Sequence, residues 1–232
     1  MSEAIICYEK AREIGVEFCN LDLEAESLHH LGLCKAELWE VQEAIKIFEQ
    51  VSSISENTYV HEHAVLAWTR LAFFNSYLGN DKQAKGLIER VNIDLPKTNL
   101  RIRGKAYAML EIAATYKNLG EYEEAVEKYR QAINYAMKTR FIHVKAMALI
   151  GLAVISREQG YFETSLSYHA ESITITRCAT KFFAKKVPQD EARSRTFLAP
   201  VGQYVYYRRV YHRCFLLCGR LAQSSNSRAS HS

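Results

Sequence analysis

One pattern of residues recurs along most of the chain at intervals of 40 or 41 residues. Its clearest copy is 106–139, where apolar residues are spaced as on one face of a helix on both sides of a tight turn at Leu119-Gly120-Glu121. A helical hairpin this short cannot bury its apolar faces by itself, so it requires neighbours of the same kind. The pattern therefore predicts a stack of helical hairpins.

Several separate markers keep this interval. The second helix of each hairpin carries a small residue, which is Ala4, Ala44, Ala84, Ala125 or Ser165. Four positions later stands a bulky residue, which is Tyr8, Phe48, Ile88, Tyr129 or His169. The first helix carries the pairs Leu31-Gly32, Leu71-Ala72, Ile112-Ala113 and Leu152-Ala153. The turn position holds Gly79, Gly120 and Gly160, with Trp39 in its place once.

These residues resemble the tetratricopeptide (TPR) repeat family. Trp68-x-x-Leu71-Ala72, Ala84-x-x-x-Ile88 and Pro96 follow the family pattern in one repeat, and Tyr116, Gly120, Tyr122, Ala125, Tyr129 and Ala132 follow it in the next. An interval of about 40 residues, rather than about 34, is similar to the longer variety of this repeat. The resemblance implies an all-α protein, a right-handed α-solenoid of antiparallel helical hairpins.

The markers predict a TPR-like array over residues 1–176. A half repeat is expected at 1–20, and full repeats are expected at 23–57, 58–97, 99–139 and 141–176. The partner of the first helix would precede Met1, and a terminal cap should be polar on its outer side. Residues Ile5, Ile6 and Cys7 are apolar instead, which favours a fragment of a longer protein.

The character of the chain changes after residue 176. Residues 177–232 hold 11 Lys or Arg and 2 acidic residues, a net charge of +9, whereas the array holds 19 and 24, a net charge of −5. We expect a basic C-terminal extension, partly helical and then disordered at its Ser-rich end. Residues 201–221 fit one more helix packed on the last hairpin, although their Val and Tyr content also permits a strand.

No constellation of catalytic or metal-ligating residues is recognisable. Adjacent His29 and His30 point about 100° apart on a helix, and His61 and His63 also diverge, so neither pair chelates one ion. Metal-ligand spacings and glycine-rich phosphate loops are missing from the sequence. We therefore expect a protein that is not an enzyme, with no cofactor, no metal and no small-molecule substrate.

The sequence favours a cytoplasmic protein. It contains no run of 18 apolar residues and no basic region followed by an apolar one at its start. Its 6 cysteines include no Cys-x-x-Cys pair, and Cys7 and Cys34 stand in apolar helical stripes. A reducing compartment suits such thiols best.

The resemblance implies a binding surface, because the first helices of TPR hairpins line a concave groove. By the register of this repeat, the groove residues are His29, Leu33, Arg70, Phe73, Tyr77, Tyr107, Leu110, Glu111, Asn118 and Met147. Such a mixture of aromatic, aliphatic and charged side chains suits an extended peptide or a helix of a protein partner. Packing between helices is an equal alternative for Leu110, whereas we expect Arg70, Phe73 and Tyr77 to be exposed.

Two functions from different classes remain open. The first is a protein-interaction scaffold that binds a partner segment in the groove. The second is association with nucleic acid or an anionic membrane through the basic extension, where Tyr206-Tyr207-Arg208-Arg209 interleaves aromatic and cationic side chains. The acidic array argues against a groove that reads RNA.

Overall fold

The computed structural model describes residues 2–56, 61–139 and 141–186, and within these ranges the chain forms helices and no strand. The helices are α1 (Ser2–Glu17), α2 (Leu21–Glu37), α3 (Val41–Glu56), α4 (His61–Tyr77), α5 (Asp81–Asp94), α6 (Ile102–Asn118), α7 (Tyr122–Lys138), α8 (Ile142–Glu158) and α9 (Phe162–Lys186). A short 3-10 helix, η1 (Leu95–Lys97), follows α5. The predicted all-α solenoid is confirmed.

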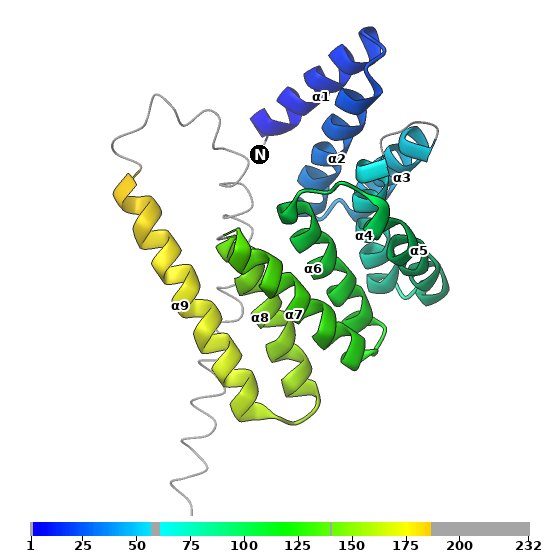
Figure 1. Ribbon diagram of the computed structural model, residues 1–232. Coiled ribbons are helices and arrows are strands. Elements are labelled where there is room, and N and C mark those ends of the chain that lie inside the picture. Colours follow the sequence, from blue (N-terminus) through cyan, green and yellow to red (C-terminus); the bar gives the residue numbers. More distant parts are fainter. Residues whose placement is uncertain (1, 57–60, 140, 187–232) are drawn as a thin grey trace, which may run out of the picture.

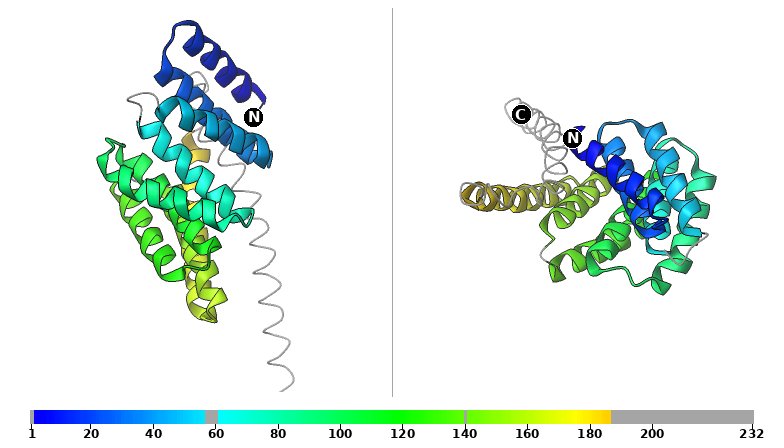
Figure 2. Two further views of the ribbon diagram at one scale, coloured as in Figure 1. Left: turned by 90° about the vertical axis from the view of Figure 1, so that its right-hand side faces the viewer. Right: turned by 90° about the horizontal axis from the view of Figure 1, so that it is seen from above.

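The helices stack as antiparallel pairs along one direction (Figure 1). The first helices α2, α4, α6 and α8 contact one another in sequence order, and each packs against its second helix, α3, α5, α7 or α9. Two further views place the N-terminal helices at one end of the stack and α8 with α9 at the other (Figure 2). The first helices begin at Leu21, His61, Ile102 and Ile142, which are 40 or 41 residues apart.

The last helix reaches farther than the predicted last repeat. α9 continues to Lys186, whereas the repeat pattern ends at residue 176. The predicted helix or strand over 201–221 and the predicted disordered end lie outside the described residues.

Each tight turn between helices uses the same hydrogen bond. A backbone N–H donates to the carbonyl five residues earlier at Asn20, Glu40, Asn80, Glu121 and Tyr161, over 2.7 to 3.0 Å. This bond needs a residue with positive φ just before the donor. Gly79, Gly120 and Gly160 have φ of 78° to 84°, but Cys19 and Trp39 take the same place with φ of 52° and 62°. These two side chains stand where glycine is favoured.

The repeat markers form the core. Ala44, Ala84 and Ala125 are fully buried, and so is Phe48, which belongs to the same core cluster as Ala44 and Ala125. Small residues let the helices approach closely: a Cβ on Gly32 would lie 2.9 Å from the Phe48 ring. The alternation of small and bulky residues therefore sets the spacing between neighbouring helices.

The last hairpin keeps this packing with serines in place of alanines. Ser165 and Ser172 are buried on α9, and their hydroxyls donate to the carbonyls of Ala153 (2.8 Å) and Ala146 (3.1 Å) on α8. Each serine is small enough for the alanine position, and its hydroxyl is satisfied by the neighbouring helix. Hydrogen bonds between the two helices thus accompany close packing at this end.

Candidate functional site

The ten predicted groove residues all lie on the four first helices. α2 carries two of them, α4 three, α6 four and α8 one, and these helices are adjacent in the stack. We call this side of α2, α4, α6 and α8 the first-helix face. It is the candidate site because the repeat register brings side chains from distant parts of the sequence together there.

An ion pair joins the middle of this face. The Arg70 guanidinium on α4 lies 2.8 Å from a Glu111 carboxylate oxygen on α6, and the two side chains are only 19% and 12% exposed. Burial raises the pKa of Glu111, and the charge of Arg70 opposes that rise. Arg70 and Glu111 are 41 residues apart, one repeat, so they occupy the same place on neighbouring helices. Arg70 therefore has a partner on this face. Burial also raises the pKa of the nearby Glu37 carboxyl, and the charge of Arg70 opposes that rise.

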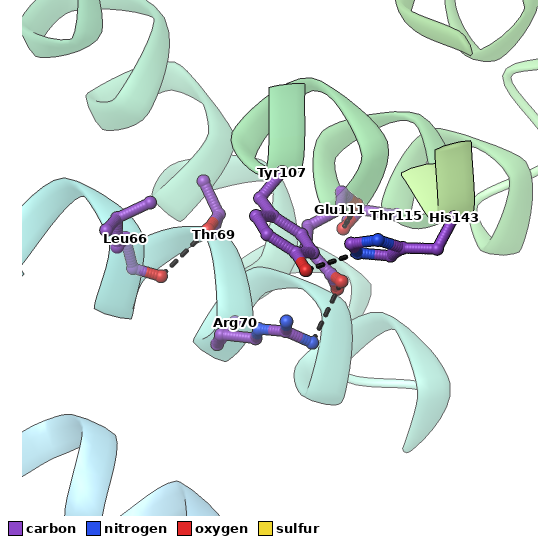
Figure 3. A network of polar contacts seen from close by, with 7 residues as sticks. All are labelled: Leu66, Thr69, Arg70, Tyr107, Glu111, Thr115 and His143. Carbon is purple, nitrogen blue, oxygen red and sulfur yellow. Dashed lines mark hydrogen bonds and ion pairs between the residues drawn. The ribbon is translucent and has the colours of Figure 1, made fainter. Parts of the chain in front are cut away.

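A second contact lies beside the ion pair. The Tyr107 hydroxyl on α6 and Nε2 of His143 on α8 share a hydrogen bond, and both rings pack against Phe141. Burial, followed by the nearby charge of Arg103, lowers the pKa of His143 to about 4. His143 is therefore neutral near pH 7. The side chains of Arg70, Glu111, Tyr107 and His143 converge between α4, α6 and α8 (Figure 3).

A third contact ties α6 to α4 near their C-terminal ends. The Asn118 side-chain amide donates to the Ser76 hydroxyl over 3.0 Å, and that hydroxyl donates to the Phe73 carbonyl over 2.8 Å. Asn118 was predicted as a groove residue, and its amide is engaged within the protein. The polar residues in the middle of the first-helix face are thus largely satisfied by one another.

The apolar members of the predicted site divide into two groups. Leu110 is only 6% exposed and belongs to the core, the alternative that the sequence left open for it. Leu33, Phe73 and Met147 are half-buried and pack against the core, which leaves part of each side chain at the surface. Tyr77 is 57% exposed at the end of α4. The first-helix face therefore presents apolar side chains around paired polar groups.

His29 lies beside a residue that the sequence did not predict for the site. Its ring centroid is 6.5 Å from that of His63 on α4, and the Phe48 ring packs on it edge-on. His63 also lies 3.3 Å from a carboxylate oxygen of Asp22. The sequence offered one signal for this contact, which is that α2 and α4 are consecutive first helices.

Potential metal ligands are dispersed over the described residues. Within 2–56, 61–139 and 141–186, no group of three His, Cys, Asp or Glu side chains is placed to hold a metal ion. Cys7, Cys19 and Cys34 are free thiols. Among the helices described, none has the length and apolar character that crossing a membrane requires. The predicted association of the basic extension with nucleic acid or membranes falls on residues outside this part and stays a prediction.

Comparison with known proteins bears on the fold. Residues 108–140 match the family described as Tetratricopeptide repeat. A solved structure of MamA, from residue 41 to its end, from Desulfovibrio magneticus RS-1 is similar with a TM-score of 0.46 and 15% identity, over 76% of this chain and 97% of that one. None of the curated proteins compared matches the sequence. The chain therefore carries a tetratricopeptide repeat, at 108–140, within an all-α array of stacked helical hairpins.

Proposed function

We propose that this protein is a protein-interaction scaffold whose first-helix face binds an extended peptide or a helix of a protein partner. The observation that carries the proposal is how polar and apolar side chains are arranged on that face. Its central polar groups pair with one another, whereas Phe73, Met147 and Leu33 keep part of their apolar surface exposed. A partner would therefore gain most by covering apolar and aromatic surface.

The internal pairing has a consequence for the kind of binding. Because Arg70 is held by Glu111 over 2.8 Å, a partner would have to replace that ion pair before using either charge. We therefore expect binding to depend weakly on ionic strength, since screening acts mainly on exposed charges. The pre-formed ion pair also keeps α4 and α6 in place, which limits the ordering cost of association.

The proposal is tested by affinity purification of the partner from the native source, followed by measurement of its dissociation constant. Phe73→Ala should weaken binding at least about fivefold, the loss expected when an aromatic anchor is truncated. The matched control is Met137→Ala, which truncates a side chain 63% exposed on the second helix α7. The proposal is wrong if Phe73→Ala and Met137→Ala bind the partner equally well.

Salt provides an independent check. Affinity should change by less than about threefold between about 0.1 and 0.5 M sodium chloride, because few unpaired charges would contribute. A steep loss of affinity over that range would instead indicate an electrostatic partner. In that case a variant lacking 177–232 would show whether the basic extension is responsible.

A further inference from the structure

The joint between the first two hairpins gathers histidines from two helices. His29 and His30 on α2 have ring centroids 5.8 Å apart, and His63 on α4 lies 6.5 Å from His29. On the α1 side, the Tyr8 ring stacks on His30 at 5.0 Å. On the α3 side, Phe48 packs on His29. Three imidazoles therefore lie where α1, α2, α3 and α4 meet.

Two of these imidazoles are incompletely bonded. Nδ1 of His29 and Nδ1 of His63 are buried and have no hydrogen-bond partner. A neutral imidazole has one N–H, so it tolerates one unpaired nitrogen that carries only a lone pair. A protonated imidazole has two N–H donors, and a buried charge with an unpaired donor is far more costly. Protonation of His29 would therefore place an N–H donor on its buried Nδ1, which has no acceptor.

The surrounding charges do not compensate a proton on His29. Arg70 on α4 adds positive charge, and its carboxylate partner Glu111 is already engaged. Asp22 contacts Nε2 of His63 rather than His29 and is mostly exposed. Burial lowers the pKa of His30, and the charge of Glu26 opposes that fall. Burial, His30, Arg70 and His63 all lower the pKa of His29.

The packing at this joint permits local opening. α2 packs against α4 less extensively than α4 packs against α6, although α3 packs broadly against α4. The indole N–H of Trp68 on α4 donates to the Ser52 hydroxyl on α3 over 2.7 Å. α2 packs against α3 about as extensively as α3 packs against α4. A tilt of α1 and α2 away from α4, with α2 still resting on α3, would therefore leave the contact between α3 and α4 in place.

We propose that the joint between α2 and α4 is a proton-operated switch, in which protonation of His29 separates α1 and α2 from α4. The open form exposes His29 to water, where both N–H groups of the protonated ring are satisfied. It also leaves α2 with fewer packing contacts, so the hydrogen bonds within α2 open more often. Deprotonation restores the closed stack. The switch acts on the shape of the array and holds whether or not the first-helix face binds a partner.

The experiment is amide hydrogen exchange of the full chain at about pH 7.5 and about pH 5.5, corrected for the intrinsic pH dependence of exchange. A single histidine that titrates only in the open form increases opening about tenfold for each pH unit below about 6.5. We expect protection in α2 to fall by about that factor at pH 5.5. In His29→Phe, which keeps a ring against Phe48, the fall in α2 should disappear.

The matched control is His169→Gln, which removes a half-buried histidine on α9 far along the stack and should leave the fall in α2 unchanged. Circular dichroism at pH 7.5 selects variants with native helix content, and His29→Gln replaces His29→Phe if the larger ring does not fit. The proposal is overturned if His29 variants keep the wild-type pH response in α2. It is also overturned if protection falls equally in all helices, which indicates global acid unfolding.

Discussion

The N-terminal helices α1 to α3 and the central helices α4 to α6 share one repeat pattern but differ in how well each position is satisfied. In the centre, Arg70 pairs with Glu111, and Gly79 and Gly120 occupy the turn positions that need positive φ. Toward the N-terminus, Cys19 and Trp39 occupy such positions, and His29 meets α4 with a buried nitrogen unpaired. Repeats that stack in the same register can therefore differ in local stability.

This difference follows from a general property of repeat arrays. Each hairpin contacts only its neighbours, so stability is a sum of local terms rather than a property of one core. Non-glycine residues with positive φ cost roughly 1–2 kcal/mol each, and an unpaired buried polar group costs roughly 1–3 kcal/mol. We call α1 and α2, with the turn at Cys19 between them, the N-terminal hairpin, and we expect the array to unfold there first.

The largest effect is expected from breaking the ion pair between α4 and α6. Glu111→Ala leaves the Arg70 guanidinium without its partner in a site where both side chains are mostly buried. We expect a loss of roughly 2–3 kcal/mol in the free energy of unfolding, measured by urea titration, because breaking a buried pair strands a charge. The double variant Arg70→Leu, Glu111→Leu should recover much of the loss. A Glu111→Ala variant as stable as Glu123→Ala, on the exposed start of α7, would contradict this.

A smaller effect is expected from pH at the joint between α6 and α8. His143 has a folded-state pKa of about 4 against 6.5 in the unfolded chain, so only the unfolded chain is protonated between those values. Its contribution is fully present above pH 6.5 and falls by about 1.4 kcal/mol per pH unit as the pH drops toward 4. Urea titrations at pH 7.5 and 5.5 should show a shallower pH dependence in His143→Phe. Equal slopes in both proteins would refute it.

The smallest effect is a gain from repairing an N-terminal turn. Cys19 is exposed and has a φ of 52°, a conformation that glycine adopts without steric cost. We expect Cys19→Gly to raise the free energy of unfolding of the N-terminal hairpin by about 1 kcal/mol. The reverse change, Gly79→Ala, should lower the free energy of unfolding by a similar amount, because residue 79 has a φ of 80°. Hydrogen exchange of α1 and α2 measures the first variant, and that of α4 and α5 the second.

The 40-residue interval was enough to predict the helices and their pairing. It also predicted the face on which Arg70 and Glu111 meet, because residues one repeat apart occupy equivalent places on neighbouring first helices. Spacing alone did not predict exposure correctly: of Arg70, Phe73 and Tyr77, all expected to be exposed, only Tyr77 is, whereas Phe73 is half-buried and Arg70 is mostly buried against Glu111. All three stand on the same first helix, α4, so their exposure depends on which side chains of the neighbouring helices cover them.

Contacts between residues that are not one full repeat apart could not be predicted, for a related reason. Tyr107 and His143 are 36 residues apart, about one helical turn short of a full repeat, so they meet only because α6 and α8 are offset. His29 and His63 likewise meet through the particular approach of α2 to α4. A sequence pattern specifies which face a residue occupies, but the angle between two helices follows from all the side chains packed between them.

Hydrogen exchange of the unmodified full chain at about pH 7.5 tests the difference between the two regions most directly. If the N-terminal hairpin is the weakest part of the stack, the slowest amides of α2 should exchange at least about tenfold faster than the slowest amides of α6. Equal protection of α2 and α6, or slower exchange in α2, would contradict the account.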